Sequence, residues 1–276
     1  MGPSGPEPTL LYQHLRSLRT NLGLGTTRAL HPHDKNQAIN DGTALTRQEL
    51  SRGRLVSTGV PSLDHLLGED GYPDKSSILV VGPPGIGKEV LGYWFIRTGL
   101  VQGDYCLYAT HRPVSDVLRD MKGVGIGVER VPDWIASSGS PIRCDLKDAT
   151  SVSYNIKEAV HRNKERRVRV ATDVMSPLLV LNPLESMYSY WSQLLSDLKQ
   201  QDTVVFALAE DGMHPPNTLT TMEQLFDGVI EMRLYEEGLA ITPLFRVKKM
   251  LGLPPLHGYF RFSVTSTGME VVPHVK

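Results

Sequence analysis

A glycine-rich segment of seven residues constrains the fold of this chain more than any other feature. It matches the phosphate-binding pattern G-x-x-x-x-G-K and reads Gly82-Pro83-Pro84-Gly85-Ile86-Gly87-Lys88. The glycines let several backbone N–H groups converge on a phosphate, and the lysine adds a positive charge. An apolar run at residues 78–81 precedes the segment, and a helical pattern at residues 90–98 follows it. This strand–loop–helix context predicts a phosphate-binding loop, whereas the pattern alone also occurs by chance.

The residue that follows the loop departs from the pattern. Position 89 ordinarily carries Ser or Thr, whose hydroxyl binds Mg²⁺, but this chain has Glu89. A carboxylate about 4 Å from a phosphate charge is repelled by roughly 4 kcal/mol at an effective dielectric constant near 20. Glu89 is therefore either an unusual metal ligand or a sign that tight binding of Mg-ATP has been lost. We favour the second interpretation.

Strand and helix patterns alternate through the middle of the chain. Short apolar runs predict buried strands, and amphipathic segments predict helices. Further strands are expected at residues 105–109, 168–172 and 203–208, and further helices at residues 115–121, 151–163 and 187–199. Strands that alternate with helices form a mostly parallel sheet with right-handed crossovers. The sequence therefore predicts an α/β fold with a mostly parallel central sheet flanked by helices.

The pattern changes after about residue 226. Strands are expected at residues 229–234, 240–249, 259–265 and 269–273, with turns at Glu237-Gly238 and Thr267-Gly268. Successive strands joined by tight turns pair antiparallel. We therefore expect C-terminal antiparallel β-hairpins that extend the edge of the sheet.

Residues 1–54 form a predicted N-terminal extension ahead of a nucleotide-binding domain at residues 55–276. Within the extension, residues 9–22 have a helical pattern, and an irregular arm follows. Four leucines share one face of this helix: Leu11, Leu15, Leu18 and Leu22. The helix either packs on its own domain or docks on a neighbouring subunit or partner. We favour packing on its own domain, because a single apolar stripe needs burial.

Composition excludes several classes of protein. The formal net charge is -1, which argues against a surface that coats nucleic acid. The two cysteines, Cys106 and Cys144, cannot form a disulfide scaffold, and no Cys/His spacing indicates zinc. The sequence contains no segment typical of a membrane span or a signal peptide. We therefore expect a soluble, cytoplasmic protein with no nucleic-acid partner.

Four further segments accompany the loop in a fixed order. They are S-T-G-V-P-S-L-D-H-L-L-G at residues 57–68, T-D-V-M-S at 172–176, F-D-G-V-I at 226–230 and R-V-K-K-M at 246–250. Together with the loop, they resemble the KaiC-like branch of the RecA superfamily over residues 57–272. The resemblance implies a RecA-like core. It also identifies residues 172–176 with the Walker B segment, an apolar strand that ends in an aspartate.

The resemblance implies roles for individual residues. Lys88 would hold the phosphates of ATP or ADP, and Asp173 would orient Mg²⁺ through a water molecule. Lys249 would reach toward a nucleotide on the adjacent subunit, because proteins of this family bind ATP between neighbours in hexameric rings. The implied cofactors are therefore ATP or ADP with Mg²⁺, and the implied partner is a second copy of the chain.

The positions implied for catalysis depart from the family pattern. The family usually places Glu-Glu after the second strand to polarise the attacking water, whereas this chain has His111-Arg112. Its arginine finger falls at position 251, which is Leu251, and Glu89 replaces the magnesium-binding hydroxyl. Such a finger contributes about 10³–10⁵ in rate, and a general base about 10²–10⁴. Efficient hydrolysis of ATP is therefore not expected.

His111 is the one candidate for a substitute base, since imidazole titrates near neutrality. The sequence shows no residue that would position it, so a solvated loop is the simpler interpretation of His111-Arg112. Asp145, Asp148, Glu210 and Asp211 receive no predicted role beyond solvation. Arg169 interrupts the apolar Walker B strand and needs a polar partner or a place at the edge of the sheet.

Three hypotheses of function follow. The leading one is an inactivated KaiC-like protein that binds nucleotide and acts as a regulatory, signalling or assembly factor. The second is an active ATPase that uses noncanonical residues, with His111, Glu89 and Asp173 as candidates. The third is a DNA-binding relative of the recombinases, for which the sequence offers only a basic cluster at Lys164, Arg166, Arg167 and Arg169.

Overall fold

The structure of this chain is a computed structural model that describes residues 55–68, 71–127, 133–140, 142–254, 256–265 and 268–272. The predicted N-terminal extension at residues 1–54, with its helix at 9–22, lies outside the described residues. Thr267 of the predicted second turn lies outside them as well.

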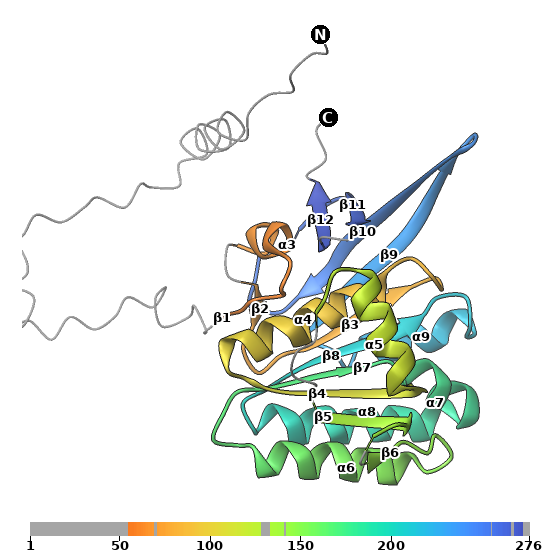
Figure 1. The fold of residues 1–276 in the computed structure, drawn as a ribbon. Helices are drawn as coiled ribbons and strands as arrows, with labels where there is room; N and C mark the ends of the chain where they lie inside the picture. The colour runs from red at the N-terminus through yellow and green to blue at the C-terminus, as the bar shows by residue number, and fades with distance from the viewer. Residues whose placement is uncertain are drawn as a thin grey trace, which may run out of the picture. The chain divides into compact units, whose positions relative to one another are not determined.

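One ten-stranded sheet organises the described part of the chain (Figure 1), in the order β12-β11-β10-β9-β3-β8-β7-β4-β5-β6. Its strands are β3 (Ser77–Gly82), β4 (Tyr105–Pro113), β5 (Asp133–Ser138), β6 (Ile142–Arg143), β7 (Val168–Thr172), β8 (Thr203–Glu210), β9 (Gly228–Glu237), β10 (Ala240–Met250), β11 (Phe260–Thr265) and β12 (Gly268–Val272). All pairs from β9 to β6 are parallel, and the pairs from β9 to β12 are antiparallel. A separate antiparallel pair joins β1 (Leu55–Val56) to β2 (Tyr72–Pro73).

Helices cover both faces of the sheet (Figure 1). They are α3 (Pro61–Leu66), α4 (Lys88–Gln102), α5 (Val114–Gly123), α6 (Ala149–Arg162), α7 (Met175–Leu181), α8 (Leu184–Lys199) and α9 (Pro216–Glu223). Alternate residues of β3 serve the two layers, since Ile78 and Val80 pack with α3–α5, whereas Leu79 and Val81 pack with α6–α9. A strand buried on both faces needs such a continuous apolar run. The predicted α/β class, with C-terminal antiparallel strands, is confirmed.

Several short elements were not predicted. No strand or helix was predicted between residues 122 and 150, where β5 and β6 extend the sheet beyond β4. Within β5, only Trp134, Ile135 and Ala136 are fully buried, and polar residues flank them, so the apolar run is too short to stand out. Asp148, expected only to be solvated, caps α6 because its Oδ1 accepts a hydrogen bond from the Ser151 N–H at 3.0 Å.

Arg169 lies in β7, between β8 and β4, and its side chain is 0% exposed. It does not lie at a sheet edge; it has polar partners instead. Its Nε donates to Asp104 Oδ2 at 2.7 Å, its Nη1 to the carbonyls of Ser57 and Phe95, and its Nη2 to Gln102 Oε1. Gly99 of α4 makes room for it, since a Cβ there would lie 2.4 Å from Arg169 Cδ. The burial of this charge is therefore compensated by hydrogen bonds and one ion pair.

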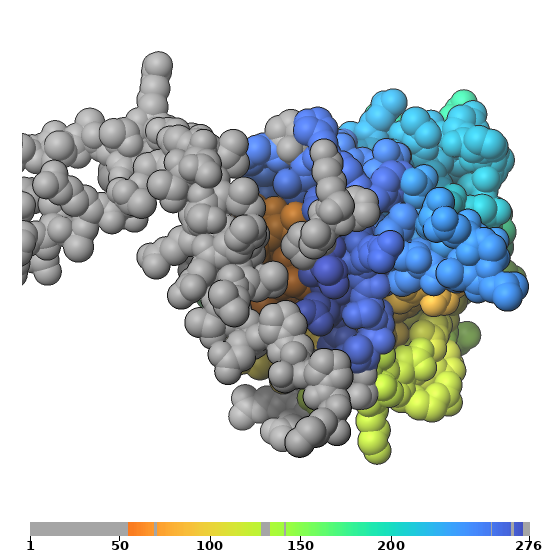
Figure 2. Space-filling view, turned by 90° about the horizontal axis from the view of Figure 1, so that it is seen from above, coloured from red at the N-terminus to blue at the C-terminus, as the bar shows by residue number. Residues whose placement is uncertain are grey.

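The β9–β10 hairpin extends past the helical layers (Figure 1). Large apolar side chains near its tip are exposed, namely Leu234, Tyr235, Leu239 and Ile241. Viewed from above, the blue C-terminal residues spread across the middle of the molecule, between the orange start of the described chain and the cyan segment around α9 (Figure 2). Among the described residues, no helix combines the length and apolarity that crossing a membrane requires.

Candidate functional site

The loop at residues 82–88 has the backbone that its glycines allow. Gly85 and Gly87 adopt φ angles of 76° and 97°, a region that residues with a side chain rarely occupy. Gly87 is the N-cap of α4, so the helix begins at Lys88 and directs its free N–H groups into the loop. Pro84 and Gly85 are exposed, whereas Ile86 is buried beneath them. The loop therefore presents its backbone at the surface, at the positive end of a helix.

Lys88 points into the site and is almost completely buried, at 1% exposed. Its ammonium nitrogen lies 2.8 Å from Glu210 Oε2, 2.9 Å from Glu89 Oε1 and 3.4 Å from the Pro83 carbonyl oxygen. Glu89 follows it in α4, and Glu210 ends β8, the strand beside β3. Two carboxylates thus surround the cation that the sequence predicts to hold phosphate.

The parallel register places the ends of four strands at one edge. Gly82 of β3 pairs with Glu210 of β8, and Thr172 of β7 pairs with Ala109 of β4. Asp173 follows β7 directly, as predicted, and donates its N–H to the Ala109 carbonyl at 3.2 Å. In parallel α/β sheets this edge is where ligands bind. The structure therefore brings Asp173 and the loop to the same edge of the sheet.

The Asp173 carboxylate is held by β4. Its Oδ2 accepts from Thr110 Oγ1 at 2.8 Å, and its Oδ1 accepts from the His111 N–H at 3.2 Å. His111 Nδ1 lies 3.2 Å from the same oxygen. The hydrogen bond to Asp173 raises the pKa of His111 above 6.5, against the opposing effect of burial. His111 is therefore positioned, although the sequence showed no residue that would do so.

His111 and Arg112 do not form a solvated loop. They belong to β4, which extends to Pro113. Arg112 donates hydrogen bonds to the carboxylate of Asp120 and to the Tyr93 hydroxyl. The expectation was wrong because β4 is longer than its apolar core, residues 105–109.

Glu210 has a defined place, contrary to the expectation of solvation. Its N–H donates to Ser176 Oγ at 2.7 Å, and His214 Nε2 lies 2.9 Å from that hydroxyl oxygen. Burial lowers the pKa of His214 and so favours its neutral ring, and a neutral Nε2 can accept a hydrogen bond from the Ser176 hydroxyl. Glu210 and His214 had no predicted role, and Ser176 was named only as part of the segment at residues 172–176. The one available signal was that Glu210 ends a strand on the ligand-binding edge.

The structure does not bring Lys249 to the loop of its own chain. Lys249 lies in β10 opposite Val229 of β9, and Val229 lies opposite Leu79, three residues before the loop begins. Burial lowers the pKa of Lys249, and it makes no ion pair with any residue in the described ranges. Leu251, at the position of the finger, is exposed.

Carboxylate oxygens suit Mg²⁺ as ligands, and Asp173 and Glu89 each supply a carboxylate at this edge. Both are engaged by other groups, Asp173 by Thr110 and His111, and Glu89 by Lys88. In the described ranges, no group of three His, Cys, Asp or Glu side chains could hold a metal by itself. The residues therefore fit a magnesium ion that takes most of its ligands from nucleotide phosphates and water, as Mg²⁺ usually does.

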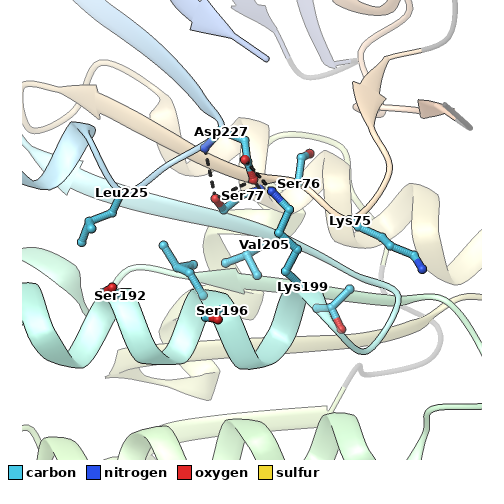
Figure 3. Close-up of a pocket in the computed structure, with 11 residues that line it drawn as sticks. Lys75, Ser76, Ser77, Ser192, Ser196, Lys199, Val205, Leu225 and Asp227 are labelled. Atoms are coloured by element: carbon cyan, nitrogen blue, oxygen red, sulfur yellow. Dashed lines mark hydrogen bonds and ion pairs between the residues drawn. The ribbon is translucent and has the colours of Figure 1, made fainter. Parts of the chain in front are cut away.

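A cavity of about 240 Å³ lies at the opposite edge of the sheet, where β3 and β8 begin (Figure 3). Asp227 and Lys199 face each other across it, with Asp227 Oδ1 2.7 Å from Lys199 Nζ. Asp227 Oδ2 also accepts from the N–H and Oγ of Ser77. The charges of Asp227 and Lys199 are paired with each other, and the cavity lies where the strands begin, whereas Lys88 follows the carboxyl end of β3. The loop edge is therefore the better candidate for a nucleotide site.

Comparisons with known proteins agree with this geometry. The chain is 25% identical over 222 residues to the circadian clock protein KaiC2 of Synechocystis, covering 79% of this chain and 39% of that protein. It is 27% identical to a UPF0273 protein of Methanopyrus kandleri, covering 79% of this chain and 92% of that protein. The chain thus spans about two fifths of the length of the KaiC2 relative.

A solved structure shares the fold. The KaiC-like protein PH0186 of Pyrococcus horikoshii superposes with a TM-score of 0.68 at 19% identity, covering 80% of this chain and 100% of that one. The model of the family "ATPase: KaiC" matches residues 56–276, most of the chain. Membership of this family implies nucleotide binding. On this match, together with the loop and its strand edge, the chain belongs to the KaiC family of ATPases.

Proposed function

We propose that the chain binds ATP or ADP at residues 82–88, hydrolyses it slowly or not at all, and acts as a regulatory, signalling or assembly factor. The observation that carries the proposal is the contrast between an intact phosphate-binding loop and altered residues at the positions implied for catalysis. The loop and its buried lysine are complete, whereas His111, Arg112 and Leu251 stand at the positions implied for catalysis.

In this proposal each group has one task. The N–H groups of the loop and Lys88 bind the phosphates, and Asp173 orients Mg²⁺ through water. Glu89 either contacts the ion or turns away from it. The ion supplies positive charge that neutralises the phosphate oxygens. None of these tasks requires bond cleavage, so they suit a sensor of bound nucleotide.

The rival hypothesis of an active ATPase depends on His111 as the base. The raised pKa shifts His111 toward the imidazolium, and an imidazolium cannot take a proton from water. The hydrogen bond to Asp173 that positions His111 is the same contact that favours its protonated form. His111 is therefore better suited to hold Asp173 than to activate water.

The rival hypothesis of DNA binding depends on a basic cluster of which only part is exposed. Arg169 is buried, and Arg167 lies largely buried beside Asp74, with 3.5 Å between Nε and Oδ1. Only Lys164 and Arg166 remain exposed. Two cations at a helix-to-strand turn contribute little to binding of a polyanion.

A homo-oligomer is part of the proposal, with a hexameric ring implied by the resemblance. Lys249 fits a role toward a neighbour's nucleotide, because it lies away from its own loop and lacks an ion-pair partner among the described residues. The exposed apolar tip of the β9–β10 hairpin adds a surface that contact with another copy would bury.

Isothermal titration of ATP and ADP, with and without Mg²⁺, tests the proposal. We expect a Kd of about micromolar order for the wild type, and no binding up to about 1 mM for Lys88→Ala. Lys199→Ala is the matched control, since Lys199 pairs with Asp227 at the opposite edge, and it should bind like the wild type. Thermal unfolding of both variants checks that they fold.

A turnover assay then separates a sensor from an enzyme. We expect the wild type to release no more than about one phosphate per bound nucleotide over an hour, far below ordinary kcat values of about 1–10³ per second. Multiple turnovers that disappear in Lys88→Ala would contradict the proposal and support an active ATPase. Absence of binding in the wild type would contradict the nucleotide site itself.

A further inference from the structure

The hydrogen-bonding capacity of Lys88 is already filled within the chain. An ammonium group has three donors, and three oxygens lie around this one, from Glu210, Glu89 and Pro83. Because Lys88 is 1% exposed, water contributes almost nothing to its solvation. The two carboxylates therefore stand where the oxygens of a phosphate would stand.

The backbone of Glu210 is held by the neighbouring strand β3 and by α7. Glu210 pairs with Gly82 in the sheet, its N–H is held by Ser176 Oγ at 2.7 Å, and the Asp211 N–H donates to the Gly82 carbonyl at 2.9 Å. Only its side chain is free to move, and 28% of that side chain is exposed. Glu210 can therefore rotate toward solvent without disturbing the backbone.

We propose that the Glu210 carboxylate, together with that of Glu89, binds the Lys88 ammonium in place of a phosphate group and thereby sets the affinity of the site for nucleotide. This inference rests on the proposed nucleotide binding and deepens it. The cluster carries one positive and two negative charges, so an incoming polyphosphate must displace a carboxylate from Lys88 and overcome its repulsion. A magnesium complex of the nucleotide meets less repulsion than the free nucleotide, because the ion cancels part of the phosphate charge.

The variant Glu210→Gln tests whether the Glu210 carboxylate takes the place of a phosphate group. A glutamine can still accept a hydrogen bond from Lys88, so the fold is retained, but it carries no charge. We expect ATP to bind on the order of tenfold more tightly than to the wild type, since a hydrogen bond to a charged group is replaced by a neutral one. Glu89→Gln should shift the Kd in the same direction. Glu158→Gln is the control, because Glu158 pairs with Arg162 on the exposed face of α6.

A second measurement tests the interaction between Lys88 and Glu210 in the absence of nucleotide. Urea unfolding of the wild type, Lys88→Met, Glu210→Gln and the double variant forms a double-mutant cycle. We expect the effects of the two substitutions to be less than additive, because each removes the same interaction. Strict additivity would overturn the pairing of Glu210 with Lys88.

The outcomes separate this inference from the proposed function. If the wild type binds ATP and Glu210→Gln binds it equally or less tightly, the inference fails, whereas nucleotide binding stands. If neither protein binds ATP up to about 1 mM, the proposed function fails, and Glu210 cannot be what sets the affinity. Tighter binding by Glu210→Gln, together with coupling in the unfolding cycle, supports both.

Discussion

His111 and Asp173 form a pair in which each side chain fixes the state of the other. Asp173 accepts hydrogen bonds from both the N–H and, in the protonated state, the ring of His111. The carboxylate is 11% exposed and the imidazole 40% exposed, so water reaches the histidine far more readily than the aspartate. Protonation of His111 therefore compensates the charge of the more buried partner.

The variant Asp173→Asn should lower the pKa of His111. The main cause of the raised pKa is the hydrogen bond to the carboxylate, and an amide cannot supply that charge. Titration of the imidazole signals by NMR measures the change. The pKa of His214 serves as an internal control, because burial is its main determinant and the carboxylate that acts on it is Glu210. An unchanged pKa of His111 would contradict the pairing.

The same pair predicts a dependence of stability on pH. A pKa that is higher in the folded state contributes stability that is fully present below the unfolded value of about 6.5 and is lost as the pH rises through the folded value. The difference in free energy of unfolding between the wild type and Asp173→Asn should therefore narrow as the pH rises above about 6.5. Urea unfolding at a series of pH values measures it, and a difference that widens with pH would contradict this assignment.

Sequence patterns predicted some residues of the candidate site and could not predict others. The loop and Asp173 are adjacent to apolar runs, so local pattern indicated them. Glu210 and Lys88 are separated by 122 positions along the chain, and they meet only because β8 pairs with β3 in one register. No local pattern carries that information, and the same holds for Thr110 beside Asp173.

At the scale of elements, α4 lies close to β7 because two glycines face the sheet. A Cβ at Gly99 would lie 2.4 Å from Arg169 Cδ and 2.7 Å from Cys106 Sγ, whereas a Cβ at Gly92 would lie 3.7 Å from Phe206 Cδ1. The first distance is a clash and the second is ordinary contact. The two positions therefore differ in their tolerance of a methyl group.

The substitution Gly99→Ala should lower the free energy of unfolding by about 1–3 kcal/mol, as overpacking in a core does. Gly92→Ala lies in the same helix and should be neutral or stabilising by up to about 1 kcal/mol, because alanine favours a helix over glycine. Chemical unfolding of both variants makes the comparison. Equal effects at the two positions would show that the approach of α4 to Arg169 does not limit packing.

The buried arginine of β7 should be far more important to stability than an exposed one. Arg169→Ala leaves Asp104 and three other acceptors without their donor, and removal of one partner of a buried pair costs about 3–5 kcal/mol. Arg162→Ala removes an exposed pair with Glu158 and should cost less than about 1 kcal/mol. Unfolding in urea measures both, and a small effect at Arg169 would mean that water replaces its contacts.

The extent of each element was harder to predict than its type. The parallel strands of the centre were predicted because both of their faces are buried and their residues are therefore apolar. The end of β4 was not predicted, since the strand continues beyond its apolar run through polar residues, of which Thr110 and His111 contact Asp173. Arg169 contradicted the apolar pattern of β7, and its contacts with α4, Asp104 and the Ser57 carbonyl explain its place.

At the scale of the whole molecule, we expect the chain to assemble. Light scattering after gel filtration should give a multiple of the 30.6 kDa chain mass, sixfold if the ring implied by the resemblance forms. Lys249→Ala should then weaken ATP binding in the assembled state and leave it unchanged in a dissociated one. A mass of one chain at every protein concentration, with or without ATP, would contradict assembly.

The position of β3 in the sheet has a consequence for synthesis of the protein. Both neighbours of this strand, β8 and β9, follow it in the chain, and β8 begins at Thr203, about 120 residues after Gly82. At translation rates of about 5–20 residues per second, roughly 6–24 s pass between the synthesis of β3 and the synthesis of β8, the first strand that pairs with it. During that interval β3, the strand that leads into the nucleotide loop, is an unpaired apolar segment to which chaperones can bind.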